Sequence, residues 1–256
     1  MASSNPSRPK MKVFQCPFQG QARASVTRSL QDKDLVLLRG APLSGKSTVL
    51  SLLFSSVGDP KGLWPIVIRS PHVHVCKSFK LSLAHALGLP STVISASPGA
   101  LLSVLYELSR NDLSVVLAID DIDIFFLGTA EEYKDACDFI FYLSKALTRL
   151  KIVGAFSRLE KINSIATDLK IKNHCVLELP CWQPNTEFFD FVNYVAGKFG
   201  INKHQVSDEA FLKSLFNSTG GATGAIVTSI KILGMSGVIN GGKVASSDHL
   251  RQLWRF

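Results

Sequence analysis

A lysine and two hydroxyl residues follow a pair of glycines at the spacing of a phosphate-binding loop. The pattern G-x-x-x-x-G-K-[ST] covers residues 40–47 and stands between an apolar run and a helix-like segment, which is the context it requires. Glycines let successive N–H groups point at one concavity, and the start of the helix adds its positive dipole end. The pattern predicts a polyphosphate site. The expected nucleotide-binding residues are Gly40, Ala41, Pro42, Leu43, Ser44, Gly45, Lys46, Ser47 and Thr48.

Within this loop Lys46 is expected to reach the β- and γ-phosphates, and the Ser47 hydroxyl is expected to hold Mg²⁺. Two carboxylates, Asp120 and Asp121, end the apolar run 115–119. A buried strand that ends in carboxylates places them at the carboxyl edge of a sheet, beside the phosphate loop. There Asp120 can orient a Mg²⁺-bound water, and Asp121 can polarise the attacking water. The alternative is that both aspartates cap the following helix.

Asp121 stands where many ATPases have glutamate, which is one methylene longer, so we expect slow hydrolysis. A third polar residue, Ser157, follows the apolar segment 151–156. Its hydroxyl could contact the γ-phosphate or the attacking water, or it could cap the next helix. The candidate catalytic residues are therefore Lys46, Asp121 and Ser157, and the candidate metal ligands are Ser47 and Asp120.

The elements that must position these residues alternate between strands and helices as far as residue 180. Strands are predicted at 35–39, 63–68, 113–119, 151–156 and 175–179, and helices at 19–31, 46–56, 76–87, 99–109, 130–147 and 158–166. This alternation favours a three-layer α/β domain with a mainly parallel sheet. After residue 180 only helices are predicted, at 187–199, 207–216, 222–235 and 247–254. We expect a flexible basic tail at 1–18, a phosphate-loop core at 19–180 and a small helical lid at 181–256.

Composition limits the class of protein. Hydrophobic residues make up 46% of the 256 and charged residues 19%, and no apolar run approaches the length of a membrane span, so we expect a globular protein away from membranes. The first dozen residues lack the apolar segment of a secretory signal, and five cysteines form no C-x-x-C pair, which favours a cytoplasmic location. The net charge of +8 favours a polyanionic partner, nucleic acid first.

Several motifs occur in the order found in the AAA+ family. They are the phosphate loop, Ile-Asp-Asp-Ile-Asp at 119–123, Ile-Val-Gly at 152–154, Leu-Pro-Cys-Trp at 179–182 and Thr-Gly-Gly-Ala-Thr-Gly at 219–224. The chain resembles AAA+ ATPases over residues 35–249. The last two motifs are similar to those of the transposition-helper ATPases of the TniB/TnsC type, although each is weak alone.

The resemblance implies an ATP-driven, Mg²⁺-dependent regulator of transposition. Its subunits would assemble as a ring or filament around duplex DNA, with ATP between neighbouring subunits, and would link a target-selection protein to the transposase. The basic charge agrees independently with DNA, because phosphate neutralisation dominates affinity for DNA that is bound without sequence readout.

Two family features differ in this chain. Where AAA+ proteins usually supply an arginine in trans, the segment 168–174 has none, and Lys172 or Lys170 is the candidate substitute, without the planar fork of arginine. The lid has Ala-Thr-Gly at 222–224 where many members carry a sensing arginine. Both differences favour a weak ATPase used as a binding switch. The DNA-contact candidates follow the second strand, in loops that line the pore of AAA+ rings: Arg69, Lys77 and Lys80.

Three other functions remain open. The first is a replication-initiator or loader-like AAA+ ATPase, although these often carry a winged-helix domain after the lid. The second is a small-molecule kinase, which would need an arginine-rich closing lid, whereas the region after residue 180 has arginine only at 251 and 255. The third is a nucleotide-locked scaffold with little turnover.

Overall fold

The structure is a computed structural model and describes residues 16–55, 63–69, 78–90, 99–109, 114–126, 129–157 and 167–235. The elements up to residue 178 are α1 (Pro17–Asp32), β1 (Leu35–Arg39), α2 (Lys46–Ser55), β2 (Leu63–Ile68), α3 (Phe79–Ala86), α5 (Gly99–Ser109), β3 (Ser114–Ile119), the 3₁₀ helix η1 (Ile122–Phe126), α6 (Ala130–Ala146), β4 (Leu150–Phe156) and β5 (His174–Glu178). Four helices follow: α8 (Thr186–Lys198), α9 (Lys203–Val206), α10 (Glu209–Thr219) and α11 (Thr223–Met235).

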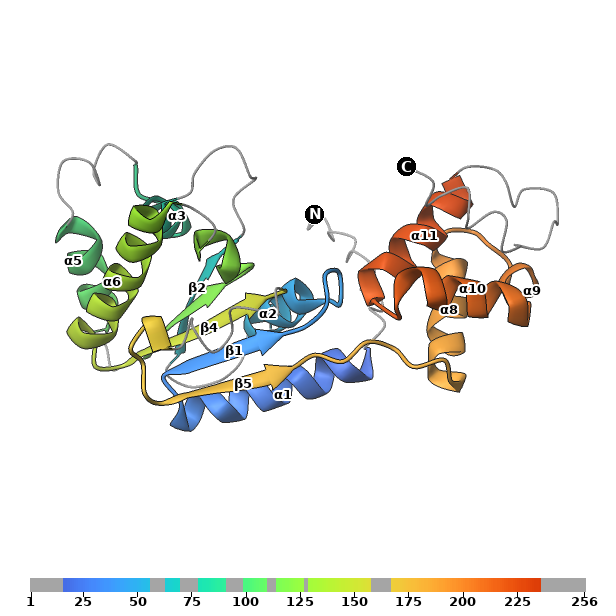
Figure 1. Ribbon diagram of the computed structural model, residues 1–256, viewed down its shortest axis with the longest axis horizontal. Coiled ribbons are helices and arrows are strands. Elements are labelled where there is room, and N and C mark those ends of the chain that lie inside the picture. Colours follow the sequence, from blue (N-terminus) through green and yellow to red (C-terminus); the bar gives the residue numbers. More distant parts are fainter. Residues whose placement is uncertain are drawn as a thin grey trace, which may run out of the picture.

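The five strands form one parallel sheet in the order β2-β3-β4-β1-β5. Alternate residues of the apolar strands face opposite layers. Leu37 and Leu117 pack with α3, α5 and α6, whereas Val36 and Val116 pack with α1 and α2 (Figure 1). Helices thus cover both faces of the central strands, which explains why these strands are near-continuous apolar runs. The predicted three-layer α/β fold is confirmed.

The two outer strands differ from the central ones in composition. Pro65 stands in β2, where an outer position tolerates a residue without a backbone N–H. In β5 the residues alternate between exposed and half-buried, and Val176 is 42% exposed. The apolar pattern is therefore weakest in β5, the strand whose predicted position at 175–179 is displaced by one residue from the observed one.

The helices α8 to α11, called the lid below, have an apolar core of their own. Its fully buried members are Phe188, Val192, Ala196, Val206, Phe211, Leu215, Ile226 and Ile230. The side chain of Asn185 accepts the Phe188 N–H at the start of α8, and Asp208 does the same for Phe211 at the start of α10. Because Asp208 is the cap, α10 begins at Glu209, two residues after the predicted start. The short helix α9 was not predicted.

The amino-terminal helix joins the lid to the sheet. It begins at Pro17, before the expected end of the tail at residue 18, because Cys16 and Phe18 pack against lid residues. The Phe18 ring meets Trp182 edge-on with 5.1 Å between ring centroids, and Trp182 stacks on Phe191 at 4.7 Å. The rest of α1 lies along β1, β5 and α2 (Figure 1).

Some expectations lie outside the described residues. These are the tail up to residue 15, the start of a helix at 76, and the helices at 158–166 and 247–254. Among the helices that are described, none combines the length and the apolar character needed to cross a bilayer.

Candidate nucleotide-binding site

The carboxyl ends of three neighbouring strands bring the candidate residues to one edge of the sheet. The phosphate loop follows β1, Asp120 and Asp121 follow β3, and Ser157 follows β4. Because β4 lies between β1 and β3, Ser157 is placed between the phosphate loop and the aspartates. The strand order, which the sequence did not reveal, therefore assembles the residues that were selected by type and spacing.

Lys46 occupies the centre of the phosphate loop and is only 5% exposed. Its Nζ donates to the carbonyl oxygens of Gly40 at 3.0 Å and Ala41 at 2.8 Å. An ammonium has three N–H donors, so one remains beyond these two bonds. Burial lowers the pKa of Lys46, while the carboxylates of Asp121, Asp123 and Asp120 act in the opposite direction. The lysine is thus a buried cation facing three acidic groups.

The last glycine of the loop is required by geometry. Gly45 has φ of +103°, and a Cβ there would collide with the side-chain amide of Gln19. Gln19 is 7% exposed, so α1 places a buried amide directly against the loop. No sequence pattern indicates Gln19, because its contact with Gly45 depends on how α1 packs against the start of α2.

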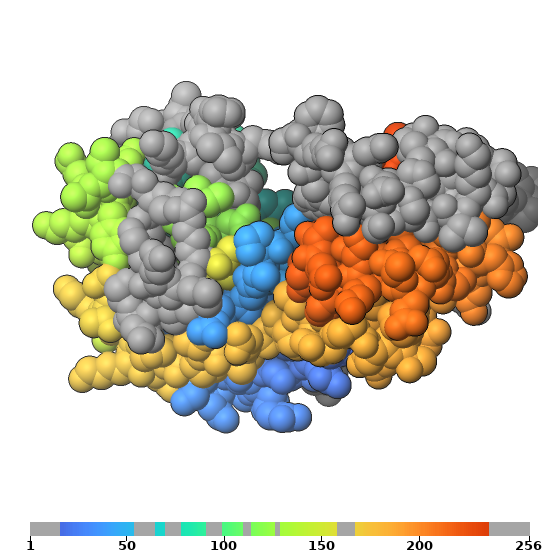
Figure 2. All heavy atoms as spheres, turned by 45° about the vertical axis from the view of Figure 1, so that its right-hand side comes forward, coloured from blue at the N-terminus to red at the C-terminus, as the bar shows by residue number. Residues whose placement is uncertain are grey.

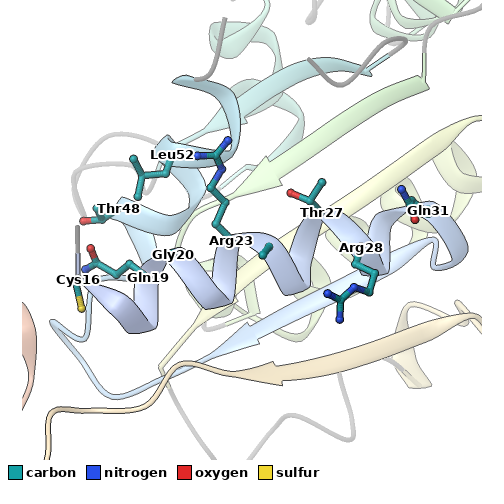
Figure 3. Close-up of a pocket in the computed structure, with 10 residues that line it drawn as sticks. Cys16, Gln19, Gly20, Arg23, Thr27, Arg28, Gln31, Thr48 and Leu52 are labelled. Carbon is teal, nitrogen blue, oxygen red and sulfur yellow. The ribbon is translucent and has the colours of Figure 1, made fainter. Parts of the chain in front are cut away.

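A pocket of about 630 Å³ runs along α1 from this point (Figure 3). Cys16, Gln19 and Thr48 line the end beside the phosphate loop, and Arg23 and Arg28 line it farther along α1. No carboxylate belongs to the lining in the described part of the chain. Burial raises the pKa of the Cys16 thiol, which keeps it neutral near pH 7. The near end therefore presents a thiol, an amide and a hydroxyl group beside the phosphate loop.

The donor set suits Mg²⁺. Ser47 is exposed at the start of α2, and Asp120 carries a buried Oδ1 that has no hydrogen-bond partner among the described residues. A buried carboxylate oxygen without a partner is unfavourable unless a water or ion meets it. Mg²⁺ prefers oxygen ligands and keeps several of its waters. Ser47 and Asp120 therefore fit the two roles expected of them.

The turn after β3 holds a residue to which the sequence assigned no role. Asp123 is 9% exposed, and its Oδ2 accepts the backbone N–H of Ser157 at 3.4 Å. Its Oδ1 is buried without a partner in the described part of the chain. Asp121, the expected base, is half-buried with φ of +47°. Only the paired strand ends reveal that Asp123 reaches Ser157.

The lid touches the phosphate loop through backbone atoms. The Gly224 N–H near the start of α11 donates to the Leu43 carbonyl at 2.7 Å, and Leu43 is held at φ of +60°. A Cβ at Gly224 would lie 2.9 Å from that oxygen. Figure 2 shows the orange-red surface of the lid directly beside the blue surface of the amino-terminal part of the core. This close contact explains why residue 224 is a glycine.

The remaining candidates lie at different ends of the strands. Lys172 is exposed just before β5, at the amino ends of the strands, whereas the phosphate loop lies at their carboxyl ends. The Nζ of Lys170 lies 5.5 Å from the Phe141 ring centroid. Arg69 is exposed directly after β2, at the same edge as the phosphate loop. Lys77 lies outside the described residues.

Lys80 has a different environment from Arg69. Its Nζ lies 5.4 Å from the Phe139 ring centroid, and it shares the lining of a small hollow with Glu132 and Asp135. Those carboxylates compete with a phosphate for the lysine, which makes Arg69 the stronger of the two described candidates for a DNA contact.

No family model and no curated protein matches the sequence. Solved structures do match. A Walker-type ATPase of Pyrococcus abyssi is similar with a TM-score of 0.64 and 14% identity, over 92% of this chain and 70% of that one. Cdc6p of Pyrobaculum aerophilum matches with a TM-score of 0.61 and 17% identity, over 93% of this chain and 67% of that one. The chain therefore shares the three-layer α/β fold of these proteins. The Orc1 protein of Aeropyrum pernix, solved in complex with DNA, matches with a TM-score of 0.56 and 14% identity, over 92% of this chain and 63% of that one.

The fold also brings together two motifs that are far apart in the sequence. The Trp182 N–H donates to the Gly221 carbonyl at 2.9 Å, and Trp182 Nε1 donates to Thr223 Oγ1 at 3.1 Å. A Cβ at Gly221 would collide with the Trp182 carbonyl. The Leu-Pro-x-Trp and Thr-Gly-Gly-x-x-Gly motifs are therefore one structural unit at the base of the lid, and they form a single signature.

Proposed function

We propose that the chain binds ATP with Mg²⁺ and hydrolyses it slowly. The observation that carries this proposal is the convergence of Lys46, Asp120, Asp121 and Ser157 at one sheet edge, under a lid that contacts the phosphate loop. Backbone N–H groups of the loop bind the phosphates, and Lys46 exchanges its bonds to Gly40 and Ala41 for phosphate oxygens.

Ser47 and Asp120 would hold Mg²⁺, which neutralises charge on the phosphates. Asp121 accepts a hydrogen bond from the attacking water and orients it, and Ser157 donates to the γ-phosphate. Cys16, Gln19 and Thr48 form the nucleoside end of the site. The short reach of Asp121 limits the rate, so the nucleotide serves mainly as a switch between two states.

Lys46→Ala tests the nucleotide site. We expect loss of binding of a fluorescent ATP analogue, and hydrolysis at the level of a no-enzyme control. Lys213→Ala removes the same charge from an exposed position on α10 and should leave both unchanged. Equal behaviour of the two variants would contradict the proposal.

We further propose duplex DNA as a partner. The net charge of +8 supports this, as does the similarity to an Orc1 protein that was solved with DNA. Arg69 is the first residue to test. Arg69→Ala should weaken binding to any duplex sequence and reduce the salt dependence by about one phosphate contact, whereas Lys213→Ala should not. An unchanged salt slope would remove Arg69 from the interface.

We propose that subunits assemble around the DNA, with Lys172 acting on the neighbour's nucleotide. Lys172 lies at the amino ends of the strands and the phosphate loop at their carboxyl ends, so Lys172 acts only in trans. Lys172→Ala should therefore retain nucleotide binding but lose ATP-dependent assembly. Mixing it with Lys46→Ala subunits should restore part of the hydrolysis, because each variant supplies what the other lacks at some interfaces.

Regulation of transposition is the specific role that we propose, with a transposase and a target-selection protein as partners. The resemblance of the Leu-Pro-x-Trp and Thr-Gly-Gly-x-x-Gly motifs to those of transposition-helper ATPases supports it. The test is electron microscopy with duplex DNA, comparing a slowly hydrolysed ATP analogue with ADP. Rings or filaments only with the analogue are expected, and monomers under both conditions would contradict this role.

The similarity to Cdc6p and Orc1 favours a second candidate, a replication-initiator or loader-like ATPase. An initiator of this kind is expected to bind particular duplex sequences, whereas the transposition regulator should bind duplexes of different sequence equally. Competition between unrelated duplexes at one fixed salt concentration separates the two. Analogue binding without any turnover above Lys46→Ala would instead favour the nucleotide-locked scaffold.

A further inference from the structure

The 3₁₀ helix after β3 is fixed against β4. Ile122, fully buried, packs so closely on Gly154 that a Cβ at that glycine would lie 2.9 Å from the Ile122 side chain. Phe156, the last residue of β4, is also fully buried. The turn that carries Asp123 therefore has a defined position relative to the end of β4, where Ser157 begins.

Asp123 spans the gap between the two strand ends. Its Oδ2 accepts the Ser157 N–H at 3.4 Å, which is longer than the 2.7–2.9 Å usual for a bond to a carboxylate. Its Oδ1 is buried and has no partner in the part of the chain that is described. Hydrogen bonds of this kind are often long in free enzymes and shorten when the substrate is bound.

We propose that Asp123 is a positioning residue that holds Ser157 against the γ-phosphate. The carboxylate fixes the backbone N–H of Ser157, and the Ser157 hydroxyl is thereby held between the phosphate loop and Asp121. Asp123 itself contacts neither nucleotide nor attacking water. This inference rests on the proposed ATPase function, and it adds a residue to which the spacing of the sequence assigned no role.

The position of Asp123 agrees with this role. Asp123 is one of three carboxylates, with Asp121 and Asp120, that raise the pKa of the buried Lys46 against the effect of burial. Asp138, exposed on α6, offers a control in which a carboxylate is lost without any link to Ser157.

The test is a double-mutant cycle on single-turnover ATP hydrolysis, with analogue affinity measured alongside. Asp123→Ala should slow hydrolysis by about 10- to 100-fold, as expected for a misplaced catalytic group, and change analogue affinity by less than about threefold. Asp123→Asn should retain most of the rate, because its amide oxygen can still accept the Ser157 N–H. In a Ser157→Ala background, Asp123→Ala should slow the reaction no further. Asp138→Ala should match the wild type.

Several results would overturn the proposal. Additive effects of Asp123→Ala and Ser157→Ala would mean that Asp123 does not act through Ser157. A rate for Asp123→Asn as low as that for Asp123→Ala would assign the effect to the charge itself. A wild-type rate in Asp123→Ala or in Ser157→Ala would remove the role altogether. If Asp123→Ala does not fold, Asp123→Leu, which is of similar size and has no acceptor atom, takes its place in the cycle. A wild-type protein without hydrolysis would refute the ATPase function itself, and this inference with it.

Discussion

Replacing Gly224 by alanine should uncouple the lid from the phosphate loop. The new Cβ would lie 2.9 Å from the Leu43 carbonyl oxygen and 3.2 Å from the Leu43 Cβ, and the first contact is with backbone that cannot rotate away. The helix or the loop must shift by several tenths of an ångström, which weakens the 2.7 Å hydrogen bond between them. That bond contributes about 0.5–1.5 kcal/mol. Alanine raises helix propensity by up to about 1 kcal/mol, so overall stability should change little.

The affinity for nucleotide should change even though the free energy of unfolding changes little. A displaced loop loses part of its N–H cradle, and a loss of about 1–2 kcal/mol in binding corresponds to about a 5- to 30-fold higher Kd. The assay is titration with a fluorescent ATP analogue, beside thermal unfolding. Gly197→Ala is the matched control, because a Cβ there meets nothing within 4 Å. It should raise stability slightly and leave the Kd alone. Wild-type affinity in Gly224→Ala, or equal weakening in both variants, would refute the argument.

Three further predictions concern packing, capping and pH. Trp182→Phe loses the Nε1 bond to Thr223 and part of the stack on Phe191, and should cost about 2–3 kcal/mol in urea unfolding; a loss below 0.5 kcal/mol, roughly one weak bond, would contradict this. Thr129→Ala removes the capping box of α6 and should cost about 1 kcal/mol without changing hydrolysis. Burial raises the pKa of Cys137 from 9.0 to about 11, so the folded state holds this proton more tightly and stability should fall as pH rises from 9 to 11. Cys137→Ala should show a smaller fall, measured by unfolding at each pH.

The sequence predicted the elements best where one physical effect dominates. The runs at Leu35 and Val115 are apolar throughout because helices cover both faces of those strands, and they were placed within a residue. The start of α10 was misplaced because Asp208 caps it, and a cap is hard to tell from a first-turn acid in sequence. The first helix begins at Pro17 and not at the predicted residue 19, because Cys16 and Phe18 pack against residues far away in the chain.

In the candidate site, too, the residues of a local motif were predicted and the residues that depend on distant contacts were not. Lys46 belongs to a local motif, so its burial and its bonds within the loop follow from spacing. Gln19, Asp123 and Gly224 each depend on contacts between elements distant in sequence, and local patterns carry no information about them. The missing arginine before β5 was visible in sequence, but the structure adds that Lys172 lies across the sheet from its own phosphate loop.

The helix α1 contacts both the lid region and the sheet. Phe18 in its first turn packs against Trp182, and Val26 and Leu30 in its later turns pack on the sheet. A rotation of the lid relative to the sheet would therefore have to bend α1 or separate the rings of Phe18 and Trp182. Such a rotation is opposed at two places, by the contact of Phe18 with Trp182 and by the hydrogen bond from Gly224 to Leu43.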